Sequence, residues 1–183
     1  PKLSFDAKAI APDLANLRAM AANLPKQQAD EFNAILNKNL GQMPGGKADG
    51  QTFKDVVSNL GERSKAFGAS TDTYQRDLGA ALGEAKKVFR EGLKLSNPAH
   101  AKELSAIDEG YANYVRIRGA SASAGDKSSG FTPAQLSAAV RGSDKSVGKG
   151  NTATGEALMQ DLSDAGRPVL PSKVPDSGTP LRS

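Results

Sequence analysis

The sequence is poor in the residues that build large cores and reactive centres. It has no cysteine, no tryptophan and a single histidine among 183 residues, and aromatic residues make up 5% of the chain. The absence of cysteine excludes disulfide bonds, thiolate nucleophiles and cysteine metal ligands. A core built mainly from Ala, Leu and Val must gain its packing density from the close approach of helices. We expect a monomer of modest stability that gains stability from neighbouring chains.

Long apolar runs are also missing. No stretch approaches the roughly 20 apolar residues that span a bilayer, and the first residues lack the charged start and apolar core of a signal peptide. We therefore expect no membrane contact of this segment. Because the sequence starts at Pro1 without an initiator Met and ends on a polar tail, we expect a fragment of a larger protein.

A concentrated charge of one sign is absent as well. The formal net charge of +4 is spread along the chain: residues 1–119 hold 17 basic and 14 acidic side chains, and residues 120–183 hold 7 and 6. Dedicated nucleic-acid binders instead gather their basic residues on one face. The balance leaves open only weak, nonspecific contact with DNA.

What the sequence does contain is apolar residues at helical spacing. A stripe of side chains three and four positions apart predicts an amphipathic helix. Such stripes predict helices over 12–24, 25–40 and 51–67, formed by Leu14, Leu17, Met20, Ala21 and Leu24, by Phe32, Ile35, Leu36 and Leu40, and by Phe53, Val56, Val57, Leu60 and Phe67. A short apolar arm, 1–10, precedes them, and a glycine-rich loop, 41–50, separates the second from the third.

The strongest helical pattern covers 71–119 and is broken once, at Ser96-Asn97-Pro98. We predict that Thr71 caps its first arm and that Pro98 opens its second. The two stripes are Tyr74, Leu78, Ala81, Leu82, Ala85, Val88, Phe89 and Leu93, and then Leu104, Ile107, Tyr111, Tyr114 and Val115. Two apolar stripes joined by a tight break predict a helical hairpin whose arms bury each other.

The composition changes after Arg118. Residues 119–130 are rich in Gly, Ser and Ala and predict a flexible linker. Thr132-Pro133 then predicts a helix start. Two short stripes follow, one of Leu136, Ala139 and Val140, and one of Ala157, Leu158, Leu162 and Ala165 in a helix expected over 153–165. We predict an all-α fold, with a helical bundle over 1–118, a Gly/Ser-rich linker over 119–130, a helical C-terminal appendage over 131–166 and an extended Pro-rich tail over 167–183.

The segment 142–150 carries the candidate anion site. A phosphate loop needs four residues between its glycines and then Lys followed by Ser or Thr, whereas here five residues separate the glycines and Gly150 follows Lys149. Nucleotide binding is therefore not predicted. Arg141, Lys145 and Lys149 are spaced four apart, so a helix through them would present a basic edge to phosphate groups of DNA or lipid. A solvated polar face, interrupted by glycines, is the simpler interpretation of these residues.

The other polar residues do not indicate catalysis. His100 lies in an expected first helical turn, and no Ser, His and acid pattern surrounds it. The carboxylate pairs Asp108 with Glu109 and Asp161 with Asp164 lie on polar helix sides, whereas glycoside hydrolysis needs two carboxyls facing each other across a cleft. We predict no catalytic residue, no cofactor and no metal site.

Tyr111 and Tyr114 permit two interpretations. With Arg116 and Arg118 they would form a stacking platform for bases. Their helical spacing beside Ile107 favours the other interpretation, core packing with the hydroxyls at the rim.

Three pieces of the sequence form a recognisable set. They are 106–116 (Ala-Ile-Asp-Glu-Gly-Tyr-Ala-Asn-Tyr-Val-Arg), 130–140 (Gly-Phe-Thr-Pro-Ala-Gln-Leu-Ser-Ala-Ala-Val), and 157–166 (Ala-Leu-Met-Gln-Asp-Leu-Ser-Asp-Ala-Gly) with 170–180 (Leu-Pro-Ser-Lys-Val-Pro-Asp-Ser-Gly-Thr-Pro). Together they resemble a segment of large phage and prophage virion proteins, some of which are similar to the internal, DNA-ejection proteins of short-tailed bacteriophages. The resemblance covers about residues 51–183, and no motif in it is catalytic.

The resemblance implies a virion protein that is delivered to the host cell envelope at infection and helps DNA across it. It also implies an oligomeric assembly with other virion proteins and with copies of itself. We therefore expect a non-catalytic virion component that acts by protein contacts. Two alternatives stay open: a nucleic-acid-binding module that uses Arg141, Lys145 and Lys149, and a fragment of an envelope-degrading enzyme.

Overall fold

The computed structural model describes residues 3–124, 130–144 and 149–170. It is mostly helical, which confirms the all-α prediction. The chain divides into two compact units, Pro1–Ser105 and Ala106–Ser183. Each unit has its own apolar core. Within the ranges described, no helix is both long enough and apolar enough to cross a membrane.

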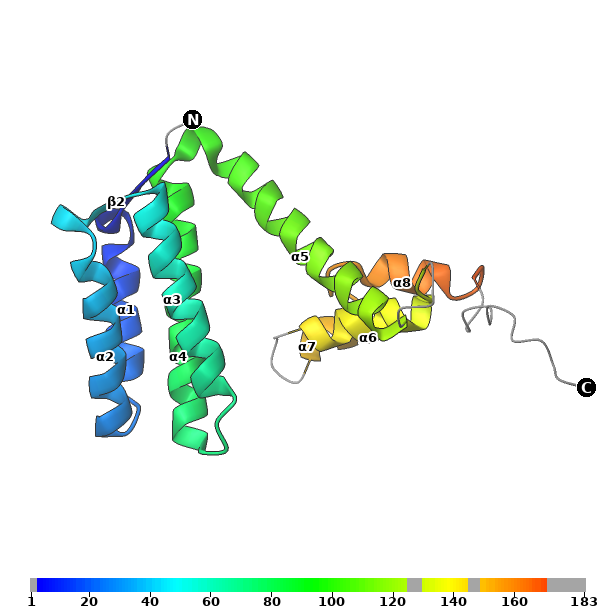
Figure 1. Ribbon diagram of the computed structural model, residues 1–183, viewed down its shortest axis with the longest axis horizontal. Helices are drawn as coiled ribbons and strands as arrows, with labels where there is room; N and C mark the ends of the chain where they lie inside the picture. Colours follow the sequence, from blue (N-terminus) through cyan, green and yellow to red (C-terminus); the bar gives the residue numbers. More distant parts are fainter. Residues whose placement is uncertain (1–2, 125–129, 145–148, 171–183) are drawn as a thin grey trace, which may run out of the picture. The chain divides into compact units, whose positions relative to one another are not determined.

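The first unit is a bundle of four helices, α1 (Ala11–Ala21), α2 (Lys26–Gly41), α3 (Gly50–Gly68) and α4 (Thr73–Ser96), which lie side by side in Figure 1. Three of these confirm the helices predicted from the stripes before Phe67, within a few residues at each end. Helix α4 contacts each of the other three. Its buried stripe is Leu78, Leu82, Ala85 and Phe89, so the periodicity identified its inward face correctly.

Close approach of α3 and α4 supplies the packing that the small side chains require. A methyl group built on Gly79 would lie 2.6 Å from the backbone nitrogen of Gly68 and 2.9 Å from the carbonyl oxygen of Ser64. The Ser64 hydroxyl donates a hydrogen bond to the Gly79 carbonyl oxygen at 2.7 Å. The two helix backbones therefore touch, as expected for a core with few large residues.

Two short strands close one end of the bundle, and the sequence patterns did not predict them. Strand β1 (Ser4–Asp6) pairs antiparallel with β2 (Lys47–Asp49), with Phe5 opposite Ala48. The buried Phe5 ring packs against Phe53 and Phe89, with ring centroids 5.1 and 5.4 Å apart. Short 3-10 helices, Ala7–Ile10 and Pro44–Gly46, flank the strands.

The break after α4 holds strand β1 in place. Asn97 accepts a hydrogen bond from the Ser4 backbone nitrogen at 3.3 Å and donates one to the Ser4 carbonyl oxygen at 2.7 Å. The Asp6 backbone nitrogen donates to the Ser96 hydroxyl at 3.1 Å. The residues of the predicted helix break thus bind the backbone of a strand that lies more than 90 residues earlier in the chain.

The predicted hairpin over 71–119 is wrong in its packing. After a 3-10 turn, Pro98–His100, helix α5 (Ala101–Ala124) begins, but α4 directs its apolar stripe at α3, α1, α2 and β1. The residue that caps α4 is Asp72 rather than Thr71, since its side chain accepts hydrogen bonds from the Tyr74 and Gln75 backbone nitrogens. The stripe of α4 is therefore already covered inside the first unit.

The second unit consists of residues 106–124 of α5 with α6 (Pro133–Ser143), α7 (Gly150–Thr154) and α8 (Gln160–Gly166). Thr132 caps α6 in a reciprocal arrangement with Gln135, which confirms the predicted helix start. The core of this unit comprises Ala120, Leu136, Val140 and Ala157. Leu136, Val140 and Ala157 belong to the two short stripes predicted from the sequence. The fourth core residue, Ala120, lies on α5.

Three boundaries in the second part differ from prediction. The linker expected over 119–130 begins as helix, since α5 continues to Ala124, and 125–129 lie outside the described residues. The helix expected over 153–165 is two short helices, because Gly155 and Met159 adopt positive φ angles of 83° and 66°. Residues 167–170 of the expected extended tail form turns, and 171–183 lie outside the described residues.

Candidate functional site

The predicted basic edge does not form as a helix face. Helix α6 ends at Ser143, and Lys149 has a left-handed backbone with φ 60°, so Arg141 and Lys149 do not share one helix. Lys145 lies outside the described residues. The Lys149 ammonium donates a hydrogen bond to the Asp144 carbonyl oxygen at 2.7 Å. Arg141 is exposed on α6. Arg141 and Lys149 therefore do not lie on one helix face, and contact of the three residues with phosphate groups stays a prediction.

The Asp144 side chain bonds to the first turn of α7. One of its carboxylate oxygens accepts hydrogen bonds from the Thr152 backbone nitrogen, at 2.9 Å, and from the Thr152 hydroxyl, at 2.7 Å. The buried Asp144 and the Lys149 contact together join the end of α6 to α7.

His100 and the carboxylates occupy ordinary helix-surface positions. The His100 ring lies 3.3 Å from a Glu103 carboxylate oxygen, one helical turn away, and Asp164 pairs with Arg167 at 3.7 Å. Across the described ranges, no three His, Cys, Asp or Glu side chains gather closely enough to hold a metal ion.

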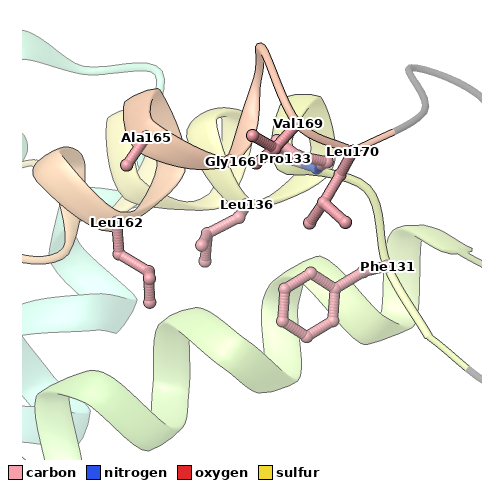
Figure 2. Close-up of a pocket in the computed structure, with 8 residues that line it drawn as sticks. All are labelled: Phe131, Pro133, Leu136, Leu162, Ala165, Gly166, Val169 and Leu170. Carbon is pink, nitrogen blue, oxygen red and sulfur yellow. The ribbon is translucent and has the colours of Figure 1, made fainter.

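An apolar pocket lies between α6 and α8 in the second unit (Figure 2). Its volume is about 380 Å³, and every side chain that lines it is apolar. Its walls are Phe131, Pro133, Leu136, Leu162, Ala165, Gly166, Val169 and Leu170. Leu162 is 60% exposed, although its spacing predicted a buried position, because the break at Met159 turns Ser163 inward in its place. The pocket offers van der Waals contact to an apolar group.

One face of α5 is exposed and apolar. Ile107, Tyr111 and Tyr114 are 60%, 63% and 56% exposed, and they recur at helical spacing. Val115 and Ile117 are also exposed, and Ala120 is the one buried residue of the helix. The Tyr111 and Tyr114 rings contact each other with centroids 6.4 Å apart. We call Ile107, Tyr111, Tyr114 and Val115 the α5 stripe.

The prediction that Tyr111 and Tyr114 pack in a core is therefore wrong. Helical periodicity reports that a face is apolar but does not say whether that face is covered within the chain. The alternative platform with Arg116 is not supported either, since the Arg116 guanidinium donates to the Ala112 carbonyl oxygen at 2.8 Å. The presence of Tyr rather than Leu at these positions could have indicated exposure, because Tyr suits sites where one end of the side chain contacts apolar groups and the other contacts water.

The stripe lies opposite the side of α5 that the second unit covers. At 3.6 residues per turn, Ile107, Tyr111 and Tyr114 point about 180° away from Ala112, Arg116 and Ala120. Ala120 is fully buried, and Ala112 and Arg116 are half-buried. Within the second unit, helix α5 is thus packed along one side and uncovered along the other. Contiguous apolar faces of this kind mark interaction sites.

Fold and surface together define a helical protein whose second unit leaves one apolar helix face uncovered. Comparison of the chain with protein-family models, with curated proteins and with solved structures finds no match.

Proposed function

We propose that this chain is a non-catalytic component of a phage virion, an internal protein of the DNA-ejection type that works through protein contacts. The α5 stripe is the observation that carries the protein-contact part of this proposal. An aromatic and aliphatic face left in water costs free energy, and association with a partner recovers it. The virion context rests on the resemblance of 106–116, 130–140 and 157–166 with 170–180 to a segment of phage virion proteins.

The construction of the second unit supports the same proposal. Its described core holds four buried apolar residues, and its helices α7 and α8 are short. A unit with so small a core rearranges at low free-energy cost, which suits a protein that is packed in a particle and then passes out of it.

Mass spectrometry of purified particles tests the proposal. Phage particles from the source of this sequence are analysed before and after DNA release is triggered, with the major capsid protein as the internal standard. We expect peptides of this chain in filled particles and a loss of at least tenfold from emptied ones. Absence from filled particles, or full retention in emptied ones, contradicts the proposal.

A further inference from the structure

We infer that the α5 stripe is covered by the α5 stripe of a second copy of this chain, with the two helices antiparallel about a two-fold axis near Ala112 and Asn113. This inference rests on the proposed function for its premise that the chain acts by assembly, and it names the partner and the geometry. The distribution of charge along α5 favours a second copy as the partner.

The charges of α5 within the second unit are segregated by sign. Asp108 and Glu109 lie in its first half, and Arg116 and Arg118 lie in its second half. Arg118 continues the stripe, because it follows Tyr114 by four residues and Tyr111 by seven. It is exposed. The stripe therefore ends in a cation at one end and has the Asp108 carboxylate beside it at the other, whereas Glu109 and Arg116 point to the opposite side of the helix.

This layout selects the antiparallel arrangement. In a parallel pair, Arg118 would face its own copy and the like charges would repel across the interface. In an antiparallel pair, each Arg118 lies beside Ile107 of the partner subunit, next to the partner's Asp108. Tyr111 then packs against the partner's Tyr114, so the same self-complementary patch serves both chains, as a two-fold interface requires.

The contact area predicts a reversible dimer rather than a permanent one. The stripe offers four large apolar side chains over three helical turns, less than the area that stable interfaces of standard size bury. Aromatic residues carry much of the binding free energy in such interfaces. We expect a monomer–dimer equilibrium in the micromolar range, visible by sedimentation velocity on the full chain.

Matched tyrosine variants test whether the stripe forms the contact. Tyr111→Asp removes an aromatic anchor and places a carboxylate in the interface, which should raise the dimer dissociation constant roughly thirtyfold. Tyr74→Asp is the control, because Tyr74 is 55% exposed on α4 and is not part of the stripe. Circular dichroism confirms that both variants keep their helical content. Equal dimerisation of Tyr111→Asp and the unmodified chain overturns the inference.

Disulfide trapping tests whether the two α5 helices run antiparallel. Because the unmodified sequence has no cysteine, each variant carries a single thiol. Two single variants, Ile107→Cys and Arg118→Cys, are oxidised separately and as a mixture. In the antiparallel pair the two different positions lie side by side, whereas identical positions lie about 16 Å apart along the axis, too far for a disulfide. We expect cross-linked dimer in the mixture and at most one tenth as much in either variant alone.

Two further results overturn the inference. Cross-linking of each variant with itself shows parallel helices. A chain that stays monomeric at all concentrations shows that the stripe is covered by its own first unit or by a different protein. The mass-spectrometry experiment separates this failure from failure of the proposed function, because a monomeric chain found in particles refutes only the dimer, and a dimer absent from particles refutes only the virion role.

Discussion

Gly79 shows at the scale of one residue how a chain with few large side chains reaches a dense core. The space beside its α-carbon is filled by the backbone of α3, which cannot move aside as a flexible side chain does. Glycine is required here for close approach and not for an unusual backbone angle.

We predict that Gly79→Ala destabilises the first unit by about 3 kcal/mol, because the added methyl group forces α3 and α4 apart. Urea denaturation followed by circular dichroism measures the change. Gly41→Ala is the matched control in the same unit, since nothing lies within 4 Å of the added methyl group and Gly41 ends α2. That change should be neutral or stabilising by up to about 1 kcal/mol. Equal effects of the two substitutions would contradict backbone contact at Gly79.

Lys86 is a second residue whose surroundings have a measurable consequence. Partial burial, and then the nearby charges of Arg90 and Lys65, lower the pKa of Lys86 below 10.5. The unfolded chain therefore binds more protons at this site in the pH window just below 10.5, so the contribution of Lys86 to stability rises with pH there. We predict that Lys86→Met is more stable than the unmodified chain at pH 7 and that this advantage shrinks as the pH approaches 10.5.

Lys26 serves as a control, because its pKa is shifted in the opposite direction. The hydrogen bond and charge of Asp30, 2.6 Å away, raise the pKa of Lys26 above 10.5. Its contribution is present below pH 10.5 and is lost as the pH rises through the folded-state pKa. Lys26→Met should therefore lower stability slightly at pH 7, and the difference should vanish at higher pH. Thermal unfolding at a series of pH values compares both variants, and the same pH trend in both would refute these assignments.

At the scale of elements, strand β1 depends on the end of a distant helix. Asn97 bonds both backbone groups of Ser4 and also donates to the Leu93 carbonyl oxygen at 2.7 Å. We predict that Asn97→Ala lowers the free energy of unfolding by about 1–2 kcal/mol, because three hydrogen bonds are lost and the one to Leu93 is partly buried. Asn23→Ala is the control, since Asn23 makes one long local bond of 3.4 Å to the Ala19 carbonyl oxygen. A loss at Asn97 no larger than at Asn23, measured by urea denaturation, would show that the Phe5 ring, the pairing with β2 and the Ser96 hydrogen bond hold β1 without Asn97.

The elements also show what the sequence could and could not predict. The stripes located α2, α3 and α4 and the inward faces of α3 and α4, because burial against any partner imposes the same periodicity. They could not name the partner, so α4 was paired with α5 when it packs on α3. Three-residue strands are too short for an alternating pattern, and β1 pairs with β2 from over 40 residues away. The sequence identified the apolar spacing of the α5 stripe but not its exposure to solvent, since exposure depends on the whole fold.

At the scale of the whole molecule, the two units differ in how much they bury. Among the described residues, the core of the first unit holds 16 buried apolar side chains and that of the second holds four. Because burial of apolar area is the main stabilising term, the second unit should open far more often than the first. This difference matters for the proposed function, since a protein that leaves a particle must repack some part of itself, and the part with the smaller core repacks at the lower cost.

Hydrogen exchange measures this difference directly. We predict that backbone amides of α3 and α4 exchange slowest and that those of α6 and α8 exchange at least about a hundredfold faster, after correction for intrinsic rates, because less apolar area must be exposed to open them. The comparison is made on Tyr111→Asp as well, so that protection by a dimer is separated from protection by the fold. If α8 exchanges as slowly as α4 in both proteins, the second unit is as stable as the first, and repacking on release has to be sought in the bundle of α1 to α4 instead.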